Sequence, residues 1–118
     1  MSALPPIVMI HGMWCVGEIW SSFRLPFEAA GYTVHTPTLR HHALGAPHPE
    51  LGTTSLRDYV DDLAAFIATL PERPILIGHS MGGLLTQLLV AKGLAKAAIL
   101  ICSAAPRGVF PVRLSMLP

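Results

Sequence analysis

The sequence has 118 residues, of which 52% are hydrophobic and 13% are charged, and its formal net charge is +1. This composition is too apolar for a disordered chain, and the small net charge argues against a dedicated nucleic-acid binder. No apolar run reaches the roughly eighteen residues of a membrane span, and the N-terminus lacks the basic segment of a signal peptide. We therefore expect one cytoplasmic domain with neither a nucleic-acid nor a membrane partner.

The first half of the chain predicts two strands and one helix. Residues 6–10 form an apolar run typical of a buried strand, and a helix is expected over 19–30, interrupted by Pro26. Residues 32–37 predict a second strand. The stretch 40–53 contains prolines, glycines and histidines, and we expect it to be a loop.

The second half predicts two helices that alternate with two strands. Residues 55–70 give the clearest helical pattern, because Ser55 and Asp58 fit a capping box and apolar residues recur at helical spacing. These apolar residues are Leu56, Tyr59, Val60, Leu63, Phe66, Ile67 and Leu70. We expect this helix to end at Pro71. Strands are expected over 74–80 and 97–104, with a helix over 82–93 between them.

The alternation of strands and helices predicts an α/β fold with a parallel sheet and crossover helices. The third and fourth strands are apolar at successive positions, which is typical of strands covered on both faces. If the second strand lies on the far side of the first, right-handed crossovers place the first helix on one face and the other two helices on the opposite face. One face of the third and fourth strands would then lack a helix, and another polypeptide segment should cover it.

One motif carries chemistry: Gly78-His79-Ser80-Met81-Gly82 is a G-x-S-x-G sequence between an apolar strand and a helix. That context is expected of a nucleophile elbow, in which a serine occupies a strained turn with an exposed hydroxyl. The glycines allow close packing, and the helix N-terminus favours developing negative charge. A glycine-rich turn with a spectator serine is the plainer alternative, and no phosphate-loop motif is present.

Three segments resemble the α/β-hydrolase superfamily: "PIVMIHGMWCVGEIW" its His-Gly loop, "LIGHSMGG" its elbow and "AAILICSAAPRG" the strand that follows. The resemblance implies that residues 1–118 form a single incomplete domain, the N-terminal portion of that fold. It also implies that Ser80 is the nucleophile and that the backbone amides of Met13 and Met81 form the oxyanion hole. The substrate pocket is expected to include Gly12, Trp14, His79 and Phe110.

The family order implies an Asp or Glu and then a His after the nucleophile, but residues 81–118 contain none of the three. We therefore expect another polypeptide, or a part lost by truncation, to supply the acid and the histidine. Earlier histidines are poor substitutes. His79 adjoins Ser80 and should point elsewhere, and His11 is expected to hold the oxyanion loop by hydrogen bonding.

We expect no metal and no cofactor. His41, His42 and His48 have an unconvincing metal-ligand spacing, and we interpret them as a solvated rim. Cys15 and Cys102 also lack such spacing and are expected to be buried thiols, with a disulfide only in an oxidising compartment.

The resemblance implies a serine hydrolase that cleaves small carboxylic esters through an acyl-enzyme. A non-catalytic ligand-binding or interaction protein on the same scaffold, associating as a homo-oligomer, is an alternative. A lyase or C–C hydrolase is another, because the fold does not fix the reaction. Residues 81–118 carry four basic and no acidic side chains, which indicates either solvated helix ends or an acidic neighbour outside the chain.

Overall fold

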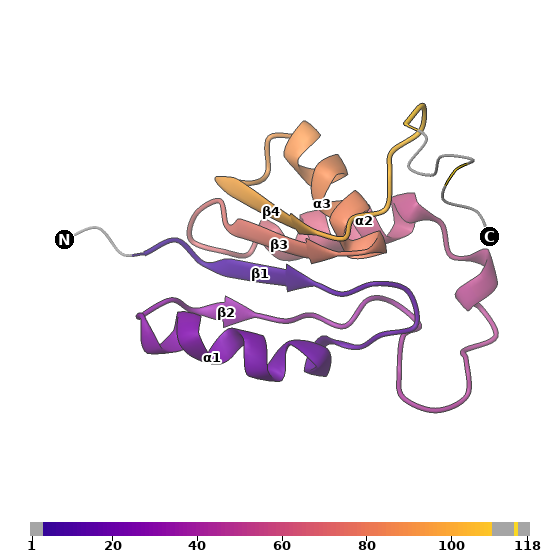
Figure 1. Cartoon of the computed structure of the whole chain (residues 1–118), viewed down its shortest axis with the longest axis horizontal. Coiled ribbons are helices and arrows are strands. Elements are labelled where there is room, and N and C mark those ends of the chain that lie inside the picture. The colour runs from indigo at the N-terminus through magenta and orange to yellow at the C-terminus, as the bar shows by residue number, and fades with distance from the viewer. Residues whose placement is uncertain (1–3, 110–114, 116–118) are drawn as a thin grey trace.

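The computed structural model describes residues 4–109 and residue 115. Within that part of the chain, four strands form one sheet in the order β2-β1-β3-β4, and every neighbouring pair is parallel (Figure 1). The strands are β1 (Ile7–Ile10), β2 (Val34–His35), β3 (Ile75–His79) and β4 (Ala97–Ile101). The predicted parallel α/β sheet is confirmed, with β2 on the far side of β1 from β3 and β4.

The central position of β1 in the sheet accounts for its apolar sequence. Each of its residues is at most 1% exposed, because side chains on both faces of the strand enter a hydrophobic core. The second strand is shorter than predicted, since only Val34 and His35 pair with β1. Arg24 donates from Nη2 to the carbonyl oxygen of Val34 at 2.8 Å, and Pro37 has no N–H to extend the ladder.

The helices cover the sheet as predicted, with α1 on one face and α2 and α3 on the other (Figure 1). The helical segments are the 3-10 turns η1 (Gly17–Trp20) and η2 (Leu51–Thr53) and the α-helices α1 (Ser21–Ala29), α2 (Leu56–Ile67) and α3 (Met81–Ala91). In residues 4–109, no helix is long and apolar enough to cross a bilayer.

Two details of the helices differ from the prediction. Pro26 lies inside α1 instead of interrupting it; it is exposed, and water can replace the hydrogen bond that its nitrogen cannot donate to the exposed Ser22. The helix over 55–70 ends earlier than expected, at Ile67, so that Pro71 lies beyond a short turn. Leu56, counted in its apolar stripe, is 40% exposed.

The predicted capping box at the start of α2 is present. The N–H of Asp58 donates to Ser55 Oγ at 3.1 Å, and the N–H of Ser55 donates to Asp58 Oδ2 at 2.8 Å. Two N–H groups that have no helical partner are thereby satisfied. This box fixes where the chain leaves the long loop and enters the helix.

We expect Ser55→Ala to lower the free energy of unfolding by about 1 kcal/mol, because the N–H of Asp58 loses its acceptor. Thermal unfolding followed by circular dichroism measures this as a fall in Tm of roughly 4–8 °C. Ser22→Ala, at an exposed position within α1, is the control and should leave Tm nearly unchanged. Equal Tm values for the two variants would show that the box contributes nothing.

The fourth strand is the exposed part of the sheet. Ile99 is 49% exposed and Leu100 is 45% exposed, and these neighbours point to opposite faces. Ile99 pairs with Ile77 and so lies on the α1 side, but α1 lies beside β2, at the opposite end of the sheet from β4 (Figure 1). The expectation that one face of the third and fourth strands lacks cover holds for β4 alone, because Ile77 of β3 is 2% exposed, and Leu100 shows that the other face of β4 is open as well.

Candidate active site

The carboxyl ends of β1, β3 and β4 lie at one edge of the sheet. Ile10 pairs with Gly78, and His79 pairs with Ile101, so that the segments following these strands meet there. This edge therefore brings together the loop after β1, Ser80 and the segment after β4. Parallel α/β sheets bind ligands at such edges.

Ser80 occupies a strained backbone conformation, with φ 56° and ψ −120°. This conformation is unfavourable for a residue with a side chain and persists only where the surroundings enforce it. The backbone groups of Ser80 are held by the last residue of β4 and by the segment that follows it. The N–H of Ser80 donates to the carbonyl oxygen of Ile101 at 3.1 Å, and the N–H of Ala104 donates to that of Ser80 at 2.9 Å.

The two glycines of the motif are required by close packing. A Cβ at Gly82 would overlap the carbonyl oxygen of Ile10 and lie 2.5 Å from that of His11. A Cβ at Gly78 would overlap the carbonyl oxygen of Gly82 and the hydroxyl of Thr86. The turn thus brings α3 into direct backbone contact with the end of β1, as close packing of the motif predicts.

The loop after β1 passes beside Ser80. A Cβ at Gly12 would lie 3.1 Å from Ser80 Cβ and 3.5 Å from Ser80 Oγ. Gly12 to Cys15 form a turn closed by a 3.2 Å hydrogen bond from the N–H of Cys15 to the carbonyl oxygen of Gly12. Met13 lies within this turn, one residue beyond the contact with Ser80.

The two amides predicted to be oxyanion donors belong to Met81, which follows Ser80, and to Met13 in the loop after β1. Met81 is the first residue of α3, where an N–H has no helical acceptor. The N–H of Met13 donates no hydrogen bond within the part of the chain that the structure describes. Their role stays a prediction, which the geometry leaves them free to perform.

His11 holds the loop, and this part of the sequence prediction is confirmed. It is fully buried; Nδ1 donates to the carbonyl oxygen of Gly12 at 2.7 Å, and Nε2 accepts from the N–H of Leu39 at 2.9 Å. The carbonyl can only accept and the amide can only donate, so this pair of bonds requires the neutral Nδ1–H tautomer. Burial lowers the pKa of His11 below its ordinary 6.5.

Stability should therefore fall as the pH is lowered from 7 to about 5.5. Below pH 6.5 the unfolded chain binds a proton at His11 that the fold resists, so the neutral form stabilises the fold and that contribution is lost on acidification. The Ser55 N–H lowers the pKa of Asp58 below 3.8, so the loss of stability caused by protonation of Asp58 occurs at a more acid pH than that caused by His11. Tm measured across this range should decline less steeply in His11→Gln than in the parent chain and in the control His48→Gln. Parallel slopes in the three proteins would contradict the assignment.

The predicted pocket residues take different positions. Gly12 adjoins Ser80, and His79 lines a cavity of about 270 Å³. Trp14 is 80% exposed and adopts φ 64° in the loop after β1. Phe110 lies outside the described residues. Sequence reasoning missed the other residues that line the cavity, which are Ile19, Trp20, Phe23 and Ile101. Ile19, Trp20 and Phe23 follow one another at helical spacing along η1 and α1, and this pattern could have indicated an apolar lining.

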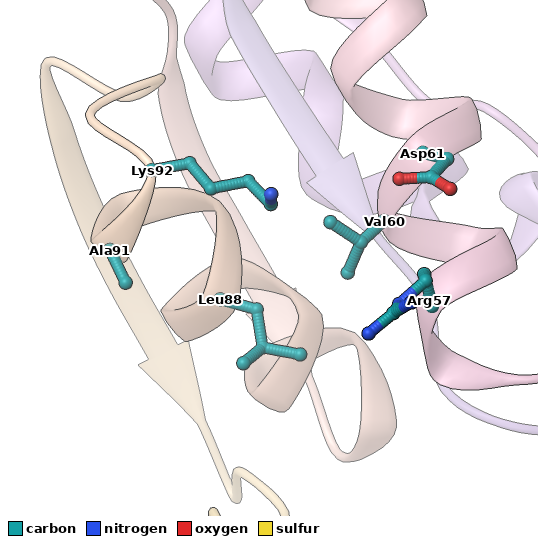
Figure 2. A pocket seen from close by; sticks show the side chains of 6 residues that line it. All are labelled: Arg57, Val60, Asp61, Leu88, Ala91 and Lys92. Atoms are coloured by element: carbon teal, nitrogen blue, oxygen red, sulfur yellow. The ribbon is translucent and has the colours of Figure 1, made fainter.

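A larger cavity, of about 520 Å³, lies between α2 and α3 and is not part of this site (Figure 2). Arg57, Val60 and Asp61 line it from α2, and Leu88, Ala91 and Lys92 from the end of α3. Leu88 lies roughly 12 Å along the helix axis from Ser80, given the rise of 1.5 Å per residue.

The loop histidines form two groups. His41 stacks on His48 with ring centroids 4.2 Å apart, and His41 Nε2 lies 3.4 Å from Glu50 Oε2. His42, in contrast, is 6% exposed and packs beside His11 and Tyr59, so the interpretation of it as a solvated rim residue was wrong. Among the residues described, no cluster of three or more His, Cys, Asp or Glu could hold a metal ion.

The cysteines also differ from the prediction. Cys15 and Cys102 are both free, with Cys15 half-buried and Cys102 exposed. Cys102 leaves the sheet at the open end of β4, where it adopts φ 45°, and no described segment covers it.

Within residues 4–109 and residue 115, no side chain forms a hydrogen bond to the Ser80 hydroxyl. The neighbouring polar side chains belong to a different network: Gln87 Nε2 donates to Ser103 Oγ at 2.9 Å, and Ser103 Oγ donates to the carbonyl oxygen of Ala104 at 2.8 Å. No side chain among the described residues is therefore bonded to Ser80 as a base would be, and the role of Ser80 as a nucleophile stays a prediction.

Known proteins resemble this chain in sequence and in fold. The chain is 34% identical over 77 residues to a pyrethroid hydrolase of Sphingobium wenxiniae, covering 65% of this chain and 27% of that protein. It is 33% identical over 86 residues to methylesterase 17 of Arabidopsis thaliana, covering 68% of this chain and 29% of that protein. A solved pyrethroid hydrolase from Sphingobium faniae superposes with a TM-score of 0.73 at 30% identity, covering 91% of this chain and 43% of the other.

The chain thus spans less than half the length of these relatives. The relatives are named as hydrolases and esterases, and the sheet matches the N-terminal portion of their fold. Residues 7–118 match the model of the alpha/beta hydrolase family. The chain belongs to the α/β-hydrolase family.

Proposed function

We propose that this chain carries the nucleophile and the oxyanion hole of a serine esterase. The observation that carries the proposal is the strained Ser80 backbone at the turn from β3 to α3, with the loop after β1 packed against it. Family membership and relatives named as esterases support hydrolysis of an ester. We name small carboxylic esters as the substrate class.

In the proposed reaction, Ser80 Oγ attacks the carbonyl carbon of the ester while a base removes the hydroxyl proton. The carbonyl oxygen becomes an oxyanion, which accepts hydrogen bonds from the N–H groups of Met13 and Met81. The tetrahedral intermediate collapses, the alcohol leaves with a proton, and water then hydrolyses the acyl-enzyme. Each preorganised amide contributes about 3 kcal/mol toward lowering the barrier.

We propose that the base and its acid partner belong to polypeptide beyond residues 1–118. The support is twofold. Residues 81–118 contain no Asp, Glu or His, and the solved pyrethroid hydrolase has more than half its length outside the match. The same polypeptide would cover β4, where Ile99 and Leu100 are exposed. Lys96 pairs with Glu72 at 3.6 Å, and the remaining positive charge of residues 81–118 favours an acidic covering surface.

Labelling with a fluorophosphonate tests the proposal. Native mass spectrometry of the purified material first shows whether a second polypeptide is bound, and peptide mapping then locates the phosphonate. We expect the adduct on Ser80, formed rapidly in the assembly and slowly on the isolated 118-residue chain. An active assembly that stays unlabelled, or that is labelled at another residue, would refute Ser80 as the nucleophile.

The exposed β4 also favours a second candidate, a non-catalytic scaffold that associates with itself. A free hydrophobic strand edge promotes pairing between copies. Light scattering distinguishes the two candidates. A stable homo-oligomer without a second polypeptide and without esterase activity supports the scaffold, whereas a one-to-one complex with a second polypeptide supports the esterase.

A further inference from the structure

A hydrogen-bond network links the middle of α3 to the carbonyl of Ser80. The N–H of Ala104 donates to the Ser80 carbonyl oxygen at 2.9 Å, which holds one side of Ala104. The carbonyl oxygen of Ala104 accepts from Ser103 Oγ at 2.8 Å and from Gln87 Nε2 at 3.4 Å, and Gln87 Nε2 also donates to Ser103 Oγ at 2.9 Å. Gln87 therefore fixes the peptide that follows the one bonded to Ser80.

The orientation of the Gln87 amide follows from its partners. The carbonyl oxygen of Ala104 can only accept, so the NH₂ group must face it. Ser103 then accepts from Gln87 and donates to Ala104, which orients every proton in the network in one direction. Gln87 and Ser103 are both half-buried, so water competes less for these bonds than on an open surface.

Two further features show that residues 102–104, the segment after β4, are tightly constrained. Cys102 adopts φ 45°, which turns the chain sharply after β4 so that Ser103 and Ala104 come back over α3. A Cβ at Gly83 would lie 2.5 Å from Ser103 Oγ and 2.9 Å from Ser103 Cα, so the segment packs directly on the first turn of α3. The strained conformation of Ser80 is thus enforced by a segment that Gln87 anchors.

We infer that Gln87 is a positioning residue that holds residues 102–104 against Ser80 and thereby fixes the side chain at position 80 relative to the N-terminus of α3. Its catalytic meaning rests on the proposed function. Gln87 acts through Ser103 and Ala104, and its side chain forms no hydrogen bond with Ser80 in the described part of the chain. Loss of the Gln87 amide should loosen the segment and weaken the stabilisation of an anion at position 80.

Two measurements on the 118-residue chain test this inference. The first is hydrogen exchange of the Ala104 amide by NMR, with Ser80 unchanged. Gln87→Met keeps an unbranched side chain without a donor, and we expect Ala104 to exchange about tenfold faster. Leu88→Met, the next residue of α3, is the matched control and should leave that exchange unchanged.

The second measurement reads the electrostatics at position 80 without needing a base. In Ser80→Cys, alkylation by iodoacetamide across pH reports the fraction of thiolate, which a helix N-terminus raises. Mass spectrometry distinguishes this thiol from Cys15 and Cys102, because the three fall in different tryptic peptides. Adding Gln87→Met should slow alkylation at pH 7 by about two- to fivefold, the size of one helix-terminus interaction.

Each outcome bears on a different part of the inference. Unchanged Ala104 exchange in Gln87→Met overturns the inference. If Gln87→Met speeds exchange of the Ala104 amide but does not change the pH dependence of alkylation in Ser80→Cys, Gln87 only stabilises residues 102–104, and its positioning role is overturned. If alkylation of Ser80→Cys has the pH dependence of an ordinary cysteine even with Gln87 present, the proposed function is contradicted, and the exchange result still decides whether Gln87 holds residues 102–104. If Gln87→Met does not fold, Ser103→Ala removes both bonds of the Ser103 hydroxyl and leaves only the 3.4 Å bond from Gln87 to Ala104, so it should produce both changes at a smaller size.

Discussion

Ser80→Ala should lower kcat for ester hydrolysis by about four to six orders of magnitude in the assembled protein. The alanine keeps the backbone hydrogen bonds to Ile101 and Ala104 and removes only the Oγ that would form the acyl bond. Substrate binding should change little, because the amides of Met13 and Met81 remain. The loss should therefore fall on kcat and leave KM nearly constant.

Steady-state hydrolysis of a p-nitrophenyl ester measures this effect, with burst kinetics as an independent readout of the acyl-enzyme. Ser22→Ala removes an exposed hydroxyl of α1 and serves as the matched control, with parental kinetics expected. Ser80→Ala that retains a tenth or more of the parental kcat would eliminate the acyl-enzyme mechanism.

The sheet and the elbow were predictable because local patterns encode them. Apolar runs specify β1, β3 and β4, and the Ser55–Asp58 box marks the start of α2. G-x-S-x-G after such a run specifies a sharp turn, since the glycine positions tolerate contacts that no side chain could make. The side of β1 on which β2 lies was inferred only conditionally, because parallel pairing is a long-range contact.

The rest of the site depends on contacts that no local pattern encodes. Residues 102–104 contain no charged side chain, yet the N–H of Ala104 holds the carbonyl of Ser80. His42 is polar and lies in a loop rich in prolines and glycines, yet it is buried beside His11. Trp20 lines the cavity near His79 because η1 precedes α1, and the expected helix did not distinguish this 3-10 turn.

The packing argument for the elbow predicts a large effect of a single methyl group. Gly82→Ala places its Cβ against the carbonyl oxygens of Ile10 and His11, which are backbone atoms and cannot rotate away. Overpacking of this kind costs about 3 kcal/mol. Alanine favours a helix over glycine by about 1 kcal/mol, so the overlap dominates. The net loss of about 2 kcal/mol should lower Tm by roughly 8–16 °C.

Thermal unfolding of the 118-residue chain measures this loss, and Gly52→Ala is the matched control. Gly52 lies in η2, and a methyl group added there would meet no atom within 4 Å, so its substitution should leave Tm unchanged or slightly raised. Equal Tm values would mean that α3 does not contact the end of β1 closely.

The added methyl group of Gly82→Ala should push α3 away from β1 and so move Ser80 relative to Gly12. Gly82→Ala should therefore reduce fluorophosphonate labelling of the assembly even at temperatures where the variant stays folded. Labelling at the parental rate in a destabilised variant would show that the elbow glycine serves packing alone and leaves the position of the serine unaffected.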